Sequence, residues 1–181
     1  TQMSDSHMRP VHISDKTRVA NKIIRCWQRS SGHDTGHPGA RLNISDINLA
    51  KLPPLNADFS HVTSLQMSDM YLHNSIDSFL VNFPNLQDLK LESSHLRELP
   101  QSLFDLQALK QLHLSNNQIT LTTEAAGKLA NLKGLRVVNL SNNPLGVIPD
   151  FSQMAELARL NLKNTGLAQW PAGIEHLEQL T

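Results

Sequence analysis

The sequence predicts an α/β solenoid, with parallel strands on a concave face and short helices or 3₁₀ turns on a convex face. Three observations predict this fold. Aliphatic residues recur in one fixed spacing, the copies follow one another at nearly constant steps, and a polar residue able to close a turn ends several copies. Self-similarity at steps between about 20 and 29 residues is typical of such repeat architectures.

The repeat has the form L-x-x-L-x-L-x-x-N-x-L, in which other aliphatic residues can replace leucine. The clearest copy is formed by Leu109, Leu112, Leu114, Asn117 and Ile119. Copies begin at residues 39, 62, 86, 109, 135 and 157, and Leu180 falls where a seventh would begin. The resulting steps are 23, 24, 23, 26, 22 and 23 residues. Residues 39–181 are therefore predicted to be leucine-rich repeats, with six copies and a seventh begun.

Each copy should contribute one short strand, because the leucines of the x-L-x-L segment point to one side. A single copy cannot bury its leucines, whereas stacked copies join them into one continuous core. At the ninth position of a copy, Asn117 and Asn143 can hydrogen-bond the neighbouring turn. The other copies have Ile47, Met70, Ser94 and Thr165 there, and the first two cannot form such bonds. We therefore expect weaker laddering at the N-terminal end of the array.

The second half of each repeat should return along the convex side. Short helical or 3₁₀ turns are predicted at Gln101–Leu106 and Ala172–Leu177, each after a proline that fixes φ. The longest return, Thr122–Leu132, predicts an α-helix with Thr122 or Thr123 as its N-cap. A buried spine of aromatic rings is expected along this side, formed by Phe59, Phe79, Phe83, Phe104 and Phe151.

Residues 1–13 are predicted to be disordered or loosely attached, and residues 14–38 to form a capping helix and a linker. The helix should begin at Ser14 or Asp15 and end near Gln28. Its apolar stripe would contain Val19, Ile23 and Trp27, flanked by Ile24 and Cys26. Such a helix can cover the open apolar end of a repeat array.

The opposite side of this helix is basic, with Lys16, Arg18, Lys22, Arg25 and Arg29. It could contact an anionic membrane or an acidic partner. A solvated face is the favoured interpretation, because covering the array requires only the apolar stripe.

The composition bounds the function. The chain has 16 basic and 16 acidic residues and 4% aromatics, which disfavours a nucleic-acid partner. No run of 18 apolar residues is present, so no membrane span is predicted. The single cysteine, Cys26, cannot form an internal disulfide and suggests a reducing compartment.

The sequence predicts no catalytic site, metal site or cofactor. Cys26 lies beside the apolar stripe, which favours a buried structural thiol over a nucleophile. His33 and His37 lie in a Gly/Pro-rich segment and would need two more ligands for a structural zinc site. Phosphate-binding loops, paired carboxylate motifs and nucleophile elbows are also absent from the sequence.

The remaining candidate site is the concave face, formed by the outward residues of the strands. Each of these residues taken alone is explained by solvation, but together they define a surface that can bind a protein. The anchors we expect are Arg41, Lys90, His113, Arg159 and Lys163, because charged side chains can fix a partner. The whole predicted partner-binding set is Arg41, Asn43, Gln66, Asp88, Lys90, Glu92, Gln111, His113, Asn139, Arg159, Asn161 and Lys163.

Four longer segments resemble a known family. They are RVANKIIRCWQR, LPPLNADFSHVTSLQMSDMYL, LHLSNNQITLTTEAAGKLANLKGLRVVNLSNNPLG and LKNTGLAQWPAGIEHL. Together they are similar to the leucine-rich repeat region of Pseudomonas-type effectors and toxins of the NEL class, which are bacterial E3 ubiquitin ligases. The resemblance covers roughly residues 17–181.

The resemblance implies a bacterial origin, secretion into the host cytoplasm and a host protein as partner. It places ligase activity in a separate helical domain after the repeats, with a catalytic cysteine in a Cys-x-Asp motif. The only cysteine here reads Cys26-Trp27-Gln28, so no catalytic role carries over and the chain itself is expected not to be an enzyme.

Three interpretations follow: a protein-binding domain of an effector or toxin, the recognition segment of a larger ligase, or an autonomous structural or adhesion repeat protein. Leu177 and Leu180 would leave an open apolar end in a seventh repeat, which predicts self-association unless more repeats or a cap follow.

Overall fold

The computed structural model describes residues 13–28, 39–47, 49, 51–72, 75–175, 177 and 179–180. The prediction of a loosely attached N-terminal segment falls outside the described residues, apart from Ile13. The predicted linker, with His33 and His37, also lies outside them, as does Arg29 of the basic helix side.

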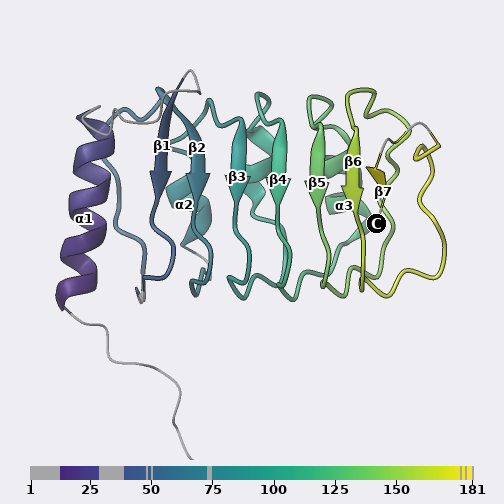
Figure 1. Cartoon of the computed structure of the whole chain (residues 1–181), viewed down its shortest axis with the longest axis horizontal. Coiled ribbons are helices and arrows are strands. Elements are labelled where there is room, and N and C mark those ends of the chain that lie inside the picture. The colour runs from purple at the N-terminus through teal and green to yellow at the C-terminus, as the bar shows by residue number, and fades with distance from the viewer. Residues whose placement is uncertain are drawn as a thin grey trace, which may run out of the picture.

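The repeats form one parallel sheet in which the strands follow the order of the sequence (Figure 1). Its strands are β1 (Ala40–Asn43), β2 (Val62–Gln66), β3 (Asp88–Lys90), β4 (Gln111–His113), β5 (Val137–Asn139), β6 (Arg159–Asn161) and β7 (Gln179–Leu180). The predicted repeat register is confirmed through β6, because equivalent residues pair across the sheet: Leu42, Leu65, Leu89, Leu112, Val138 and Leu160. The first pair of strands contains a register shift between Ala40 and Arg41.

The seventh repeat begins earlier than the sequence suggested. Leu180 pairs with Leu160, the fourth position of its repeat, and not with the first position, Leu157. Leu177 therefore stands at the start of the seventh copy, and the predicted start at residue 180 is wrong by three residues. The step from Leu157 to Leu177 is only 20 residues long, shorter than every other step between repeats.

The strand leucines lie at the centre of a single hydrophobic core. Each aliphatic residue at the paired fourth position is at most 2% exposed from Leu42 to Leu160. Burying such a side chain contributes roughly 1.5–3 kcal/mol. The core is continuous because every repeat supplies its aliphatic residues to the same interior, as the stacking argument predicted.

One feature of the turns escaped the sequence argument. The residue at the eighth position of every repeat adopts a left-handed backbone with φ between 52° and 58°. These residues are Asp46, Asp69, Ser93, Asn116, Asn142 and Asn164. Asn and Asp tolerate this conformation better than other non-glycine residues, so the short polar side chain at this position has a conformational reason.

The ninth position makes the bonds predicted for it. Asn117 Oδ1 accepts the N–H groups of Ser94 and Leu96, at 2.8 and 3.2 Å. Its Nδ2 donates to the carbonyls of Leu91 and Leu114, both at 2.8 Å. A buried polar side chain is stable only when it is satisfied in this way.

At the N-terminal end the same position is apolar. Ile47 and Met70 are buried in the core and supply no side-chain bond. Backbone pairing nevertheless continues, since Asp46 N donates to Ser68 O and Asp69 N donates to Glu92 O. The expected weaker laddering is therefore confined to the side chains.

The convex side has three short helices: α2 (Ile76–Leu80), the 3₁₀ helix η1 (Gln101–Asp105) and α3 (Thr123–Ala130). They lie behind the sheet in Figure 1. The predictions for η1 and α3 are confirmed, whereas α2 was not predicted. At Ala172–Leu177, where a helical or 3₁₀ turn was predicted, the described residues form hydrogen-bonded turns, with Leu177 N donating to Ile174 O at 3.1 Å, but no helix. Gly173 has φ +80°, outside the helical region, and an added Cβ would lie 2.2 Å from Ser152 Cα.

The aromatic spine is confirmed except at one position. Phe59, Phe79, Phe83 and Phe151 are buried, and the Phe83 ring lies 5.3 Å from that of Phe59 and 5.2 Å from that of Phe79. Phe104 is only partly buried. It packs against the core from the outside, and its ring centroid also lies 5.6 Å from the Lys128 ammonium.

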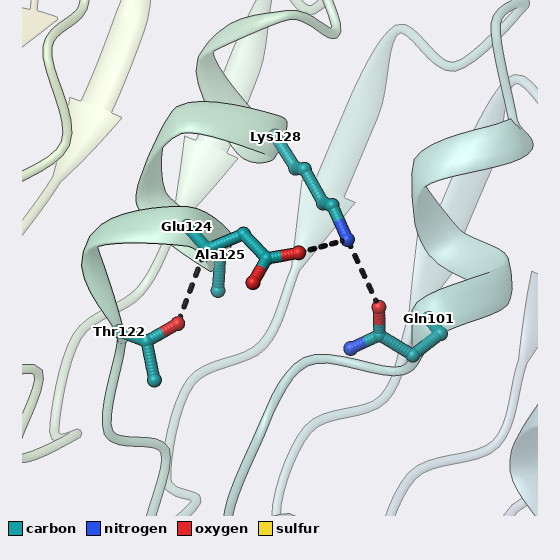
Figure 2. A network of polar contacts seen from close by, with 5 residues as sticks. All are labelled: Gln101, Thr122, Glu124, Ala125 and Lys128. Atoms are coloured by element: carbon teal, nitrogen blue, oxygen red, sulfur yellow. Dashed lines mark hydrogen bonds and ion pairs between the residues drawn. The ribbon is translucent and has the colours of Figure 1, made fainter.

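The start of α3 is fixed by polar contacts (Figure 2). Thr122 Oγ1 accepts the Ala125 N–H at 3.1 Å, which confirms Thr122 as the N-cap. Lys128 forms an ion pair with Glu124 at 2.7 Å and donates to Gln101 Oε1 of the preceding repeat at 3.4 Å. The hydrogen bond and charge of Lys128 lower the pKa of Glu124.

Replacing Thr122 with alanine should lower the free energy of unfolding by about 1 kcal/mol, because the Ala125 N–H loses its acceptor. Chemical denaturation followed by circular dichroism measures this change. Thr123→Ala is the matched control, since Thr123 is exposed inside the helix. An equal loss in both variants would contradict the capping role.

The N-terminal helix α1 (Ile13–Trp27) lies beside β1 at one end of the sheet (Figure 1). Its buried side chains are Val19, Ile23 and Cys26. The predicted place of Trp27 in the apolar stripe is therefore wrong, because Trp27 is 49% exposed. Cys26, three residues after Ile23, faces the array instead. Lys22 Nζ donates to Asn43 O at 2.9 Å, which ties the helix to the end of β1.

Candidate protein-binding surface

The predicted site residues lie on the outward side of the strands and of the positions that follow them. We call this surface the strand face and define it by the third, fifth and seventh positions of the six repeats. Its fifth positions pair directly across the sheet: Asn43, Gln66, Lys90, His113, Asn139 and Asn161. All twelve predicted residues thus share one face, since alternate strand residues point to one side.

Exposure differs along this face. Five of the twelve residues are exposed: Arg41, Asn43, Gln111, Arg159 and Lys163. The other seven are half-buried: Gln66, Asp88, Lys90, Glu92, His113, Asn139 and Asn161. Apart from Gln111 on β4, the exposed side chains lie on the first and sixth repeats, with half-buried groups between them.

The carboxylates at the centre bond to serines of neighbouring repeats. Ser64 Oγ donates to Asp88 Oδ2 at 3.3 Å, and Ser115 Oγ donates to Glu92 Oε1 at 2.9 Å. The described residues include no ion pair between Lys90 and either carboxylate. Asp88 and Glu92 accept bonds from serine hydroxyls instead.

His113 is a shielded group and a poor charged anchor. Its Nε2 atom is buried and has no hydrogen-bond partner among the described residues. The same is true of Asp88 Oδ1. Burial lowers the pKa of His113, and the Lys90 charge lowers it further, against opposing effects of Asp88 and Glu92. His113 is thus neutral at neutral pH, so Lys90 is the charged anchor at the centre of the face.

Three asparagines of the predicted set also have a structural role. The Oδ1 atoms of Asn43, Asn139 and Asn161 each accept the backbone N–H two residues later, at 3.0, 3.1 and 3.0 Å. These bonds fix the turn that follows each strand. Their amide nitrogens face the surface, and Asn43 Nδ2 donates to Gln66 Oε1 at 3.5 Å.

The prediction missed two cations at the edge of the strand face. Lys110 and Arg136 are exposed at the residues that precede β4 and β5. Arg136 forms an ion pair with Glu156 at 3.1 Å. Extending the repeat pattern by one residue before each strand would have found both, since they share the second position of their repeats.

Two other surface features lie away from the strand face. Tyr71 and His95 stack at 4.1 Å on the turn side, and Tyr71 is 55% exposed. A hollow of about 430 Å³ lies between α1 and the first repeat, with Val19 and Leu55 among its lining residues. Neither has the convergent titratable groups that catalysis requires.

Metal binding and membrane insertion find no support in the part of the chain that the structure describes. No group of three or more His, Cys, Asp or Glu side chains there could hold a metal ion. No described helix has the length and apolar character needed to cross a membrane. Burial raises the pKa of the Cys26 thiol, which disfavours the reactive thiolate.

Comparison with known proteins gives the same repeat class. Residues 84–145 match the family described as leucine rich repeat. The chain is 32% identical over 141 residues to an adenylate cyclase of Podospora anserina, which covers 77% of the chain and 6% of that protein. It is 28% identical to the septation initiation network scaffold protein cdc11 of Schizosaccharomyces pombe, over 76% of the chain and 13% of that protein.

A human relative adds a third context. The chain is 36% identical over 106 residues to the human leucine-rich repeats and immunoglobulin-like domains protein 2, over 56% of the chain and 9% of that protein. The chain thus spans between 6% and 13% of the length of these relatives. The shared segment is the repeat array, and the strand register found in residues 84–145 continues on both sides of it. The array is therefore a leucine-rich repeat solenoid, a type of domain that generally serves protein–protein interaction.

Proposed function

We propose that this chain is a protein-recognition module that holds a protein partner on its strand face and has no catalytic activity of its own. One observation carries the proposal: polar and charged side chains occupy equivalent positions on one face of six repeats in continuous register. The extended binding surfaces of repeat proteins arise from such stacking.

The chemistry of the face favours a protein over other ligands. Its groups are amides, hydroxyls and separated charges, which suit hydrogen bonds to a polypeptide. The hollow beside α1 is apolar and lies away from these groups. Small-molecule sites instead combine an apolar pocket with a few convergent polar groups.

A second candidate is the substrate-recognition segment of a larger bacterial E3 ubiquitin ligase, with its catalytic domain C-terminal to this chain. Its support is the resemblance of residues 18–29, 52–72, 112–146 and 162–177 to NEL-class effectors and toxins. Under this proposal the protein is of bacterial origin and acts in the host cytoplasm, where a buried free thiol such as Cys26 stays reduced. The relatives described above are eukaryotic, and they support only the repeat part of the resemblance.

We also propose that α1 covers the first repeat and that the seventh repeat can associate with another copy of the chain. The first proposal rests on Val19, Ile23 and Cys26, which join the core of the array. The second rests on β7, which has a strand partner only on its β6 side within the described sheet.

Site-specific photo-crosslinking tests the binding proposal. A photoreactive amino acid replaces Gln111 on the strand face or, as the matched control, Asp105 at the end of η1 on the convex side; both residues are exposed. We expect Gln111 to yield a discrete crosslinked protein in extracts of the source cells and of its host, identified by mass spectrometry. We expect Asp105 to yield none.

Crosslinks at Asp105 with none at Gln111 would move the partner to the convex side and overturn the proposal. A crosslink between two copies through Gln111 would show self-association on the strand face and would overturn the choice of the seventh repeat as the contact. For the ligase candidate, the gene downstream decides: an open reading frame that encodes a helical domain with a Cys-x-Asp loop supports it, and a stop codon shortly after residue 181 excludes it.

A further inference from the structure

The strand face is electrostatically divided, although the whole chain is neutral. In the first three repeats its charges are mixed: Arg41, Asp88, Lys90 and Glu92. In the next three repeats the second, third, fifth and seventh positions contain four cations and no acid. We call Arg159 and Lys163 on the strand face, together with Lys110 and Arg136 at the second positions beside it, the basic half of the face.

Among the residues that the structure describes, most of this positive charge has no ion-pair partner. Arg136 alone among the four forms an ion pair, with Glu156 at 3.1 Å. Arg159 and Lys163 are exposed at opposite ends of the outward side of β6, and the described residues supply neither with an acidic partner. Lys163 follows Arg159 by four residues, and in an extended chain this separation places their Cα atoms roughly 13 Å apart.

The acids of the face do not compensate for this charge. Asp88 and Glu92 lie on the β3 repeat and accept hydroxyl bonds from Ser64 and Ser115. These acids lie three strand intervals from β6, a distance of roughly 14 Å. This distance exceeds the electrostatic screening length of about 8 Å at physiological salt. Arg159 and Lys163 therefore attract an external anion as if alone.

The surface between the cations suits a polypeptide in extended conformation. Asn139 and Asn161 pair across β5 and β6 and are half-buried, and no hydrogen bond between described residues uses their amide nitrogens, which can donate to backbone carbonyls. Val137 provides a half-buried apolar patch beside Arg159, its partner in the neighbouring strand. Single-stranded nucleic acid would need stacking platforms, and no Phe, Tyr or Trp occupies the third, fifth or seventh positions of these repeats.

We propose that the basic half of the strand face receives a carboxylate-rich segment of the protein partner. This inference rests on the proposed function, because it names the chemistry of the partner bound on that face. Arg159 and Lys163 supply the principal contacts to its carboxylates, Lys110 widens the field at the edge, and Asn139 and Asn161 bond its backbone. Complementary charge of this kind governs the specificity and the rate of association.

Fluorescence anisotropy with a defined probe tests the inference. The probe is a labelled short peptide of alternating glutamate and threonine, which places its carboxylates on one side when extended. Its control is the same peptide with glutamine in place of glutamate. We expect the wild-type chain to bind only the acidic peptide, and more weakly as salt rises from about 50 to about 200 mM.

The double variant Arg159→Gln/Lys163→Gln should weaken binding of the acidic peptide about tenfold, the expected loss of two partly screened charge contacts. The control variant Lys51→Gln/Arg97→Gln removes two exposed cations away from the strand face and should leave binding unchanged. All four substitutions are at exposed side chains, so the fold should be retained in both variants.

Equal binding of the acidic and neutral peptides, or equal loss in both double variants, would overturn the inference. Tighter binding of a single-stranded oligonucleotide than of the acidic peptide, lost in the Arg159/Lys163 variant, would also overturn it in favour of nucleic acid. If the acidic peptide fails to bind while Gln111 still crosslinks a partner protein, only the inference fails. Loss of the Gln111 crosslink instead removes the proposed function itself.

Discussion

Replacing Asn117 with alanine is expected to lower the free energy of unfolding by about 3–5 kcal/mol. The Asn117 side chain is buried, and the four shortest of its five bonds join two adjacent repeats. Alanine would leave two backbone N–H groups and two carbonyls without this partner. Each buried group so orphaned costs about 1–3 kcal/mol, and partial relaxation reduces the sum.

Urea denaturation followed by circular dichroism measures this loss. The matched control is Asn131→Ala, because Asn131 is exposed at the end of α3 and should change stability by no more than about 0.5 kcal/mol. A loss below about 1 kcal/mol in the Asn117 variant would contradict the structural argument, since it would mean that water satisfies the orphaned groups.

The sheet was predictable from the sequence because its cause is periodic. A leucine that fails to meet its counterparts in the neighbouring repeats cannot be buried, so the spacing of Leu65, Leu89 and Leu112 already fixes their pairing. The N-cap of α3 was also predictable, as Thr122 or Thr123, because a hydroxyl side chain directly before a helical segment is a local signal. Features that recur along the chain, or that depend on a local sequence signal, can therefore be predicted from the sequence.

Features that depend on one place in the array were not predictable in this way. The start of the seventh repeat shifts to Leu177 because its return is short, and a spacing rule learned from longer returns misplaces it. Trp27 lies outside the helix stripe because Cys26 faces the array instead, a choice between adjacent positions that periodicity does not decide. Gly173 ends a predicted helical turn through close backbone contact with Ser152.

The candidate surface shows the same division. Which residues share the strand face follows from alternation, and the register places all twelve predicted residues there. Their partners do not follow from it: the serine bonds to Asp88 and Glu92 depend on rotamers that no spacing specifies. The neutrality of His113 arises from burial at the centre of the face, which also cannot be read from its position in the repeat.

Phe83→Ala is expected to destabilise the chain by about 3–5 kcal/mol, the range for removal of a buried ring from a close-packed core. Phe83 is fully buried and lies between two other rings, at 5.3 Å from Phe59 and 5.2 Å from Phe79. Phe59 comes from the convex return of the first repeat, and Phe79 and Phe83 come from that of the second, so the cavity would loosen contacts between two adjacent repeats. Urea denaturation again provides the measurement.

Phe104→Ala is the matched control, since the same ring is removed from a partly buried position. Its loss should be about 1–2 kcal/mol, from reduced apolar burial and the lost contact with Lys128 at 5.6 Å. If Phe83→Ala does not fold, Phe83→Leu retains most of the volume and should cost less, about 1–2 kcal/mol. Equal losses in the Phe83 and Phe104 variants would contradict the view that the buried rings stabilise the repeats jointly, because only Phe83 is fully buried and packed against two other rings.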